Sequence, residues 1–315
     1  MNINMFKGFK VFLGFLCLCP LGVWAEDSLG EHFSLNTQIP LFNSDFNPGY
    51  THEWQRQWRS GLIIGGYSAL VAWYGYASWW QQSSDHFNVR YEHWFSEDSP
   101  KGGTDKLGHA YSTYLTTRLL THGLRWAGYP HRNAIKIAGI SATAIGLGIE
   151  ILDGFTRDFG FSYEDFAMNL VGASLGMYLQ RNSDLDEMVD FRLLYERSLQ
   201  AKNLGINDPI DDYAGQTYLM IFKLDGIDAL AELPVIKYLE FALGYGAKGY
   251  QPLGAGDSFP KERTIYYGIS ANLTKMFHDM THKKPVHPTT FETISKEFLE
   301  YIQIPNTLFL SEIHL

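Results

Sequence analysis

The pattern of apolar and polar positions divides the chain into a helical part and a part rich in strands. Helical periodicity runs from about residue 52 to residue 181. After about residue 203 apolar and polar residues alternate instead, most clearly in 237–245 and 264–273. We therefore predict an α+β protein, in which a glycine-striped antiparallel helical bundle of about four to five helices precedes a small antiparallel β-rich C-terminal region.

The bundle is predicted from four apolar helical segments and a fifth segment that is charged and amphipathic. Thr104 follows a Pro/Gly-rich breaker and suits an N-cap, and Ser162 with Asp165 three residues later forms a capping-box pattern. The predicted helices cover about 60–84, 104–128, 131–153, 162–180 and 185–199.

The first of these helices leaves its relation to a membrane open. Residues 60–84 carry no charge, and 61–80 are long enough to span a bilayer between flanking tryptophans. However, Arg56 and Arg59 lie on the side that export places outside the cytoplasm, which opposes the positive-inside bias. A spanning helix, a buried central helix and a helix along a membrane surface all remain alternatives.

The N-terminus predicts export. Lys7 and Lys10 precede an uncharged run, and Ala25 supplies a small residue for cleavage, so we interpret 1–25 as a signal peptide. Cys17 and Cys19 lie inside it without the pattern of a lipidation site, and the mature protein is expected to contain no thiol. The expected divisions after it are an extended arm (26–51), a helical domain (52–202) and the β-rich region (203–315).

The β-rich region is predicted to contain about four strands. Segments 237–245 and 264–273 each place apolar residues on one face, and the Gly/Pro-rich connection 246–263 between them favours a long-looped antiparallel hairpin. Segment 216–224 is a further strand. This region is a candidate surface for docking a protein partner.

Composition narrows the classes of partner. The chain of 315 residues has a net charge of −9, and it shows no basic run, which argues against nucleic-acid binding. Aromatic residues make up 15% of the chain, a content that suits large interfaces or the edges of a membrane. A membrane or an envelope lipid is therefore the expected partner.

Candidate chemistry is concentrated where three helices are expected to meet. Short loops make neighbouring helices antiparallel, so the start of the second, the end of the third and the start of the fourth lie at one end of the bundle. The loop 154–161 would cover that end. The polar residues expected to converge there are Asp105, Lys106, His109, Glu150, Asp153, Arg157, Asp165 and Asn169.

Several kinds of chemistry fit this set. Acids with one histidine suit a divalent cation, although a lone histidine is weak evidence for a metal. Crowded carboxylates would instead make His109, Asp105 and Glu150 candidate catalytic acids and bases. Lys106 and Arg157 are candidates for binding a phosphate headgroup. A structural network of caps and ion pairs explains the same residues equally well.

These motifs also carry a resemblance. Residues 103–111 read GTDKLGHAY, 150–154 read EILDG, and 161–172 read FSYEDFAMNLVG. Over roughly residues 85–180 the chain resembles the YfiM-like family of predicted periplasmic lipoproteins, and more distantly the VanZ-like membrane proteins. The resemblance implies an envelope protein of uncharacterised biochemistry, with a hint of the cell wall or its lipid precursors. Asp153 stands where VanZ-like proteins carry glutamine.

Three functional hypotheses follow. In the first, the protein binds a lipid or a cell-wall component through the polar cluster. In the second, it is an envelope hydrolase that acts on a phosphorylated or lipid-linked substrate with His109 and the carboxylates. In the third, it is a structural protein that docks a partner, so the sequence leaves open whether the protein is an enzyme.

Overall fold

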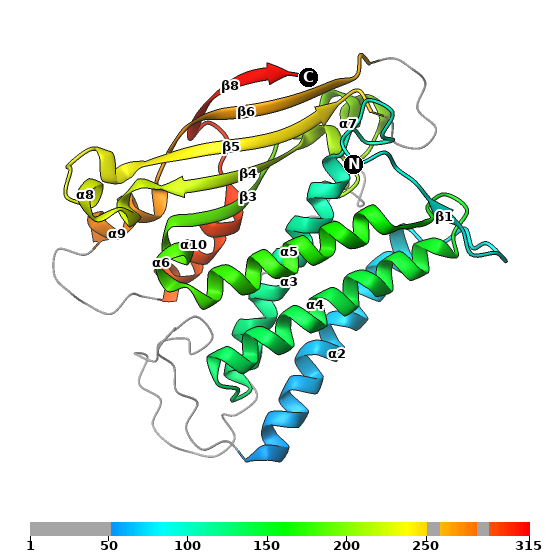
Figure 1. Cartoon of the computed structure of the whole chain (residues 1–315), viewed down its shortest axis with the longest axis horizontal. Helices are drawn as coiled ribbons and strands as arrows, with labels where there is room; N and C mark the ends of the chain where they lie inside the picture. Colours follow the sequence, from blue (N-terminus) through cyan, green and yellow to red (C-terminus); the bar gives the residue numbers. More distant parts are fainter. Residues whose placement is uncertain (1–51, 251–258, 282–289) are drawn as a thin grey trace.

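The computed structural model of the chain describes residues 52–250, 259–281 and 290–315. It is a mixed helix and strand protein with a helical N-terminal region and a C-terminal sheet, as the sequence predicts. Figure 1 shows the long helices on one side and the sheet on the other. The expected signal peptide (1–25) and extended arm (26–51) lie outside the described residues.

The helical region is built around its second long helix. The four helices are α2 (Glu53–Ser78), α3 (Thr104–Trp126), α4 (His131–Gly154) and α5 (Tyr163–Arg181). Most of α3 is buried, because α4 and α5 pack along it on one side and the sheet covers it on the other. Ser162 caps α5 by accepting a hydrogen bond from the Asp165 amide, as predicted.

Two glycines permit the close approach of these helices. A Cβ added to Gly172 of α5 would overlap the Ala110 carbonyl of α3. A Cβ on Gly146 of α4 would lie 2.9 Å from the Asn169 side chain. Backbone and side chain therefore fill the space that a larger residue would need at each position.

Helix α2 ends earlier than the sequence indicates. It stops at Ser78, and the chain then folds back so that the Trp80 ring covers Gly75. The indoles of Trp79 and Trp80 donate hydrogen bonds to Asp211 and Asp153. These tryptophans therefore bind polar groups of the protein. Within the described residues, one helix is long and apolar enough to cross a membrane by length and composition, and it is α4 rather than α2.

The sheet contains six strands in the order β7-β3-β4-β5-β6-β8. The predicted hairpin is confirmed as the antiparallel pair of β5 (Leu239–Lys248) and β6 (Glu262–Ala271). The register places Phe241 opposite Ile269 and Leu243 opposite Tyr267, so the predicted apolar faces coincide. The other strands are β3 (Val189–Tyr195), β4 (Gln216–Lys223), β7 (Ile302–Gln303) and β8 (Leu308–His314).

The predicted fifth helix is wrong. Residues 185–199 instead form the end of α6 (Ser183–Met188), strand β3 and the start of α7 (Leu199–Leu204). Asp190 and Arg192, which suggest a solvated helix face, are both buried on one face of β3. The sheet therefore begins within the segment that the sequence assigns to the helical domain.

Buried charges lie beside the apolar residues Leu219, Ile221 and Ala242 on one face of the sheet and hold it together. The Arg192 guanidinium pairs with Asp190 and with Glu240, 2.8 Å away on β5, and Lys223 pairs with Asp190 at 2.8 Å. Gln303 on edge strand β7 donates a hydrogen bond to Ser270 Oγ at 3.1 Å, although β6 lies four strands away. At about 4.8 Å between strands, that contact requires a strongly curved sheet.

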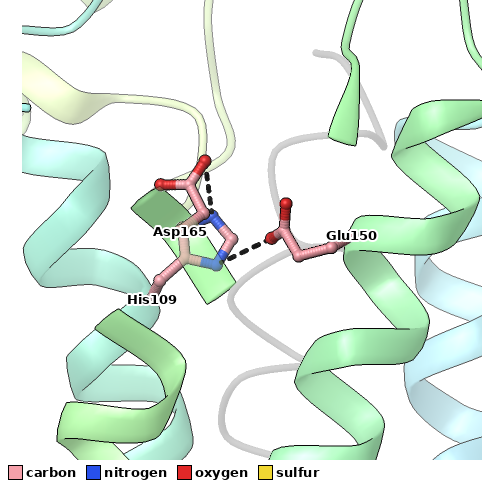
Figure 2. A group of neighbouring side chains, drawn as sticks. All are labelled: His109, Glu150 and Asp165. Atoms are coloured by element: carbon pink, nitrogen blue, oxygen red, sulfur yellow. Dashed lines mark ion pairs between the residues drawn. The ribbon is translucent and has the colours of Figure 1, made fainter. Parts of the chain in front are cut away.

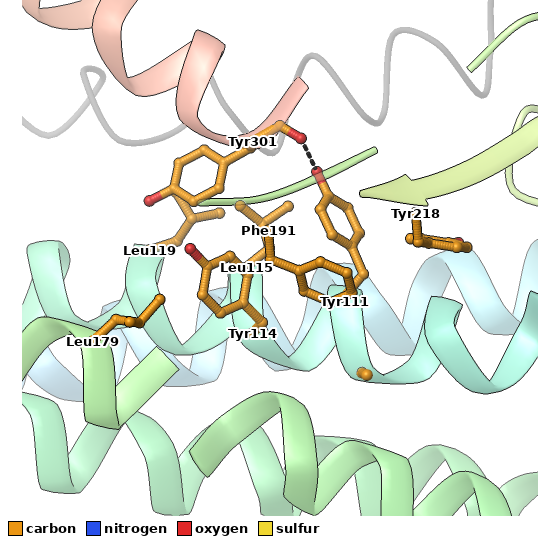
Figure 3. Packing of buried hydrophobic residues seen from close by; sticks show 9 residues of the cluster. Tyr111, Tyr114, Leu115, Leu119, Leu179, Phe191, Tyr218 and Tyr301 are labelled. Carbon is orange, nitrogen blue, oxygen red and sulfur yellow. Dashed lines mark hydrogen bonds between the residues drawn. The ribbon is translucent and has the colours of Figure 1, made fainter. Parts of the chain in front are cut away.

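The opposite face of the sheet joins the bundle in a common core. Phe191 of β3 and Tyr218 of β4 pack against Tyr111 of α3, whose hydroxyl donates to the Tyr301 carbonyl at 2.7 Å (Figure 3). Farther from α3 the same face is exposed at Phe241, among others. The two regions are thus continuous through shared aromatic packing.

Shorter elements complete the described chain. A two-stranded parallel sheet joins the loop before α3 to the loop before α5. Its strands are β1 (Val89–Arg90) and β2 (Phe161–Ser162). The other short elements are α8 (Asp228–Ala231), α9 (Leu273–Thr281), α10 (Thr290–Tyr301) and 3-10 turns at Tyr213–Gly215, Leu224–Gly226 and Ile236–Tyr238.

Candidate functional site

Three side chains from three helices meet at one end of the bundle. His109 of α3 lies between Glu150 of α4 and Asp165 of α5 (Figure 2). Its Nδ1 is 3.4 Å from Glu150 Oε1, and its Nε2 is 3.9 Å from Asp165 Oδ2. The antiparallel arrangement expected from the short loops thus brings these residues together.

Glu150 is the most unusual member of this group because it is buried and only half satisfied. Its side chain is 1% exposed. One oxygen, Oε2, accepts a hydrogen bond from the Ser162 amide at 3.2 Å. The other, Oε1, has no hydrogen-bond partner among the described residues and faces His109. A buried carboxylate oxygen without a donor is costly, so this position calls for a proton or a cation.

Lys106 lies at the centre of a second group of acids next to the first. Its ammonium is 2.7 Å from Asp165 Oδ1 and 3.2 Å from Asp105 Oδ2, and it also pairs with Glu92. The lysine side chain has no exposed area. The prediction that Lys106 binds a phosphate headgroup does not fit this geometry, because its three donors face carboxylates of the protein.

Two glutamates that sequence reasoning did not select hold the loop before α3 against this end of the bundle. Glu92 pairs with Lys106, and Glu164 accepts hydrogen bonds from the amides of Glu92 and Trp94 at 2.6 and 3.0 Å. Glu164 stands in the first turn of α5, where acids are common in any helix. Nothing in the sequence pattern distinguishes these two glutamates from surface acids.

The remaining predicted residues lie around the cluster in different roles. Asp153 accepts from the Trp80 indole at 2.6 Å. Asn169 Oδ1 accepts from Thr113 at 2.7 Å, while its buried Nδ2 finds no partner in the described part of the chain. Arg157 is exposed on the loop before β2, and the described residues provide no partner for its guanidinium. Arg157 is therefore separate from the buried cluster.

Burial and neighbouring charges shift the proton affinities of the site. Burial, together with the charges of Asp165 and Asp153, outweighs the attraction of His109 and raises the pKa of Glu150 to about 8. Burial disfavours the charged form of His109, but Asp165 and Glu150 outweigh it and raise the pKa of the imidazole. For Asp165 the attraction of His109 and Lys106 exceeds the effect of burial, so its pKa is lowered.

His109, Glu150 and Asp165 together have the composition and spacing of a cation site. One ligand atom from each lies within 4.8 Å of the others. Bonds of about 2.0–2.2 Å from nitrogen and oxygen to Zn²⁺ place two ligands at most about 4.4 Å apart, so only a small adjustment is needed. Glu92, Asp105 and Asp165 have a similar spacing, but the Lys106 ammonium already lies among them.

The segment that carries this site is also the segment that matches a known family. Residues 91–181 match the model of a family described as predicted periplasmic lipoprotein (DUF2279). The match confirms the expected resemblance to such a family over the part that includes α3, α4 and α5. It agrees with export to the periplasm or cell envelope and with membrane association. No curated protein and no solved structure matches the chain.

Proposed function

We propose that this envelope protein uses a divalent cation, held by His109, Glu150 and Asp165, to bind a phosphate-bearing lipid or cell-wall component. The observation that carries the proposal is the buried Oε1 of Glu150, which accepts no hydrogen bond from the described residues and pairs with His109 Nδ1 at 3.4 Å. A cation between these side chains would satisfy that oxygen and the imidazole together.

The ligand set indicates which cations suit the site. One imidazole with two carboxylates favours Zn²⁺, Mn²⁺ or Fe²⁺ over Ca²⁺, which prefers more oxygen ligands. Three protein ligands leave coordination positions for an outside oxygen, as in open metal sites. His109 is 25% exposed, so this side of the cluster is within reach of solvent.

Lys106 supports the proposal by keeping Asp165 ionised. The ammonium lies 2.7 Å from Asp165 Oδ1, which leaves Oδ2 on the side of His109. An ionised carboxylate is the form that binds a cation. The expected distant resemblance to VanZ-like proteins stays a prediction, and it points to the cell wall as the source of the phosphate-bearing ligand.

Native mass spectrometry and calorimetry with Mn²⁺ and Zn²⁺ test the cation. We expect one cation per chain in the unaltered protein, and a loss of affinity of at least about tenfold in His109→Ala and Glu150→Gln. Glu97→Gln is the matched control, because Glu97 is an exposed acid outside the cluster. Equal cation binding in Glu150→Gln and Glu97→Gln would overturn the proposed site.

A second measurement separates the sources of phosphate. Inorganic phosphate and dihexanoyl phosphatidic acid are titrated with and without Mn²⁺. If the Mn²⁺-loaded protein binds phosphatidic acid but not inorganic phosphate, the ligand is a lipid headgroup. If it binds both compounds, phosphate itself is the recognised group. If neither binds to the cation-loaded protein, the phosphate part of the proposal is wrong.

A second candidate function is hydrolysis of a phosphorylated or lipid-linked envelope substrate. Two shifts in proton affinity favour it. Burial keeps Glu150 protonated near neutral pH, and the pKa of the neighbouring His109 is also raised. In its neutral form His109 would accept a proton from water as the water oxygen bonds to phosphorus, and protonated Glu150 would give its proton to the leaving oxygen as the phosphoester P–O bond breaks. Unaltered turnover of a phosphomonoester lipid in His109→Ala, compared with the native protein, would exclude this role.

A further inference from the structure

The outer faces of α2 and α4 are apolar over most of their length, although nothing in the described chain covers them. On α2 the exposed positions recur at helical spacing, and no charged residue occurs in 60–78. The large exposed side chains on this face are Trp54, Trp58, Leu62, Trp73 and Tyr76.

Helix α4 shows the same property more strongly. It is apolar enough to cross a membrane, yet only 33% of its apolar window is buried inside the protein. A core helix of comparable composition would be mostly buried. Ile140 is 70% exposed, and Ile151 and Leu152 are also exposed. The apolar character of α4 therefore serves more than the internal packing of the bundle.

Charge distinguishes the two ends of this surface. Helices α2 and α4 both begin at the end of the bundle where α3 finishes, because Arg56 lies over the Tyr129 ring and Arg59 over the Trp126 ring. Arg132 and Lys136 in the first turns of α4 are exposed at that same end. Glu53 in the first turn of α2 is the acid in these opening turns, so the two helices begin with more basic than acidic residues, whereas the chain as a whole carries −9.

Basic residues next to exposed tryptophans and an uncharged apolar surface match a membrane of anionic lipids. Lysine and arginine attract lipid phosphates, tryptophan favours the headgroup level, and apolar side chains bury into the acyl region. A soluble partner would not require one surface to combine a basic end with a long uncharged apolar part.

We propose that the outer faces of α2 and α4 dock onto an anionic phospholipid bilayer, with the exposed Arg132 and Lys136 of α4 at the lipid headgroups. The basic end of this docking surface is separate from the cation site, because Arg132 lies at the start of α4 and Glu150 near its end. Figure 1 shows α2 and α4 on the side of the bundle away from the sheet.

Vesicle flotation of the exported protein, purified as the cell processes it, tests this docking. Vesicles of phosphatidylethanolamine and phosphatidylglycerol are compared with vesicles of phosphatidylcholine. We expect the anionic vesicles to bind the protein, with weaker binding as KCl rises from about 0.1 to 0.5 M. Charge reversal by Arg132→Glu with Lys136→Glu should lower binding to anionic vesicles by at least about tenfold.

Variants of the apolar surface separate it from other exposed apolar residues. Trp58→Ser with Ile140→Ser should lower binding to anionic vesicles at least about fivefold. The matched controls are Phe309→Ser and Lys248→Glu. Phe309 is 86% exposed on the sheet, and Lys248 is exposed on β5, so both variants should bind as the native protein does. Far-UV circular dichroism measured on every variant shows that the bundle is folded and keeps this test distinct from that of the cation site.

Three results would overturn the proposal. The first is a native protein that does not float with anionic vesicles. The second is equal loss of binding in the Phe309→Ser control and in the variant of α2 and α4. The third is a dimer in sedimentation velocity that dissociates in the α2 and α4 variant while vesicles do not bind, because a second copy would then cover this surface.

Discussion

The Lys106 ammonium lies 2.7 Å from Asp165 Oδ1, and no part of the lysine side chain is exposed. This ion pair links α3 to α5 and leaves the second oxygen of Asp165 directed towards His109. Because Asp105 and Glu92 also contact the ammonium, one buried positive charge compensates three acids from separate segments. A single lysine therefore connects the stability of this end of the bundle to the ionisation of the candidate site.

Removal of that positive charge should destabilise the protein strongly. Lys106→Met leaves three acids without their partner, and we expect unfolding to become easier by about 3–5 kcal/mol at pH 7. Urea denaturation measures the change. The loss should shrink at pH 5, because burial raises the pKa of Glu92 to about 6 and its protonation removes one of the negative charges. Lys202→Met, an exposed lysine on α7, should change stability by less than about 0.5 kcal/mol. Equal effects of the two changes on stability would contradict the role of Lys106 as the buried partner of the three acids.

The pH dependence of stability should report the protonation of Glu150. Its pKa is about 8 in the folded protein, above the ordinary 4.5, so the folded state binds this proton more tightly than the unfolded state. The resulting stability is complete below about pH 4.5 and is lost as pH rises through about 8. Without added cation, we therefore expect the native protein to lose stability between pH 6 and 9.

Glu150→Gln keeps a neutral side chain at every pH and should remove this dependence. Relative to the native protein it should gain on the order of 1–3 kcal/mol between pH 6 and pH 9 in the presence of a chelator. Thermal melting at a series of pH values measures the difference. Parallel pH profiles for the two proteins would show that Glu150 titrates in its ordinary range.

Two glycines on neighbouring helices allow a matched test of close packing. Gly172→Ala would drive a Cβ into the Ala110 carbonyl, so we expect a loss of about 1–3 kcal/mol in the free energy of unfolding. Gly148→Ala, where no atom lies within 4 Å of the added Cβ, should instead stabilise α4 by up to about 1 kcal/mol. Stabilisation by both changes would show that α3 and α5 lie farther apart.

The curved sheet should depend on its buried charges. Arg192→Met leaves Glu240 buried without a cation, and we expect a loss of about 3–5 kcal/mol in urea denaturation. Asp190 keeps Lys223 as its partner. Adding Glu240→Leu to Arg192→Met should therefore recover at least about half of the loss. No recovery in the double variant would indicate that Arg192 acts through Gln303 rather than through Glu240.

Local patterns in the sequence were sufficient for much of the fold. Helical periodicity and caps located α3, α4 and α5 within a few residues, and alternation located the β5 and β6 hairpin with its register of faces. These signals succeed because the period of each element and the side that it buries are properties of neighbouring residues.

Strand β3 shows where that reasoning stops. By local pattern, its Asp190 and Arg192 belong to a solvated helix face. In the structure Asp190 pairs with Lys223, 33 residues later, and Arg192 pairs with Glu240, 48 residues later. Only long-range pairing makes burial of these charges tolerable, and a local pattern contains no information about it.

The candidate site divides in the same way. The sequence determined which helix ends meet, and so it placed His109, Glu150 and Asp165 together through the antiparallel order of short-looped helices. Tertiary structure alone decided their roles: Lys106 turned inward, Glu92 and Glu164 joined from unmarked positions, and Arg157 stayed at the surface. The physical reason is that the ionisation and accessibility of a side chain depend on the charges and the burial that surround it in space.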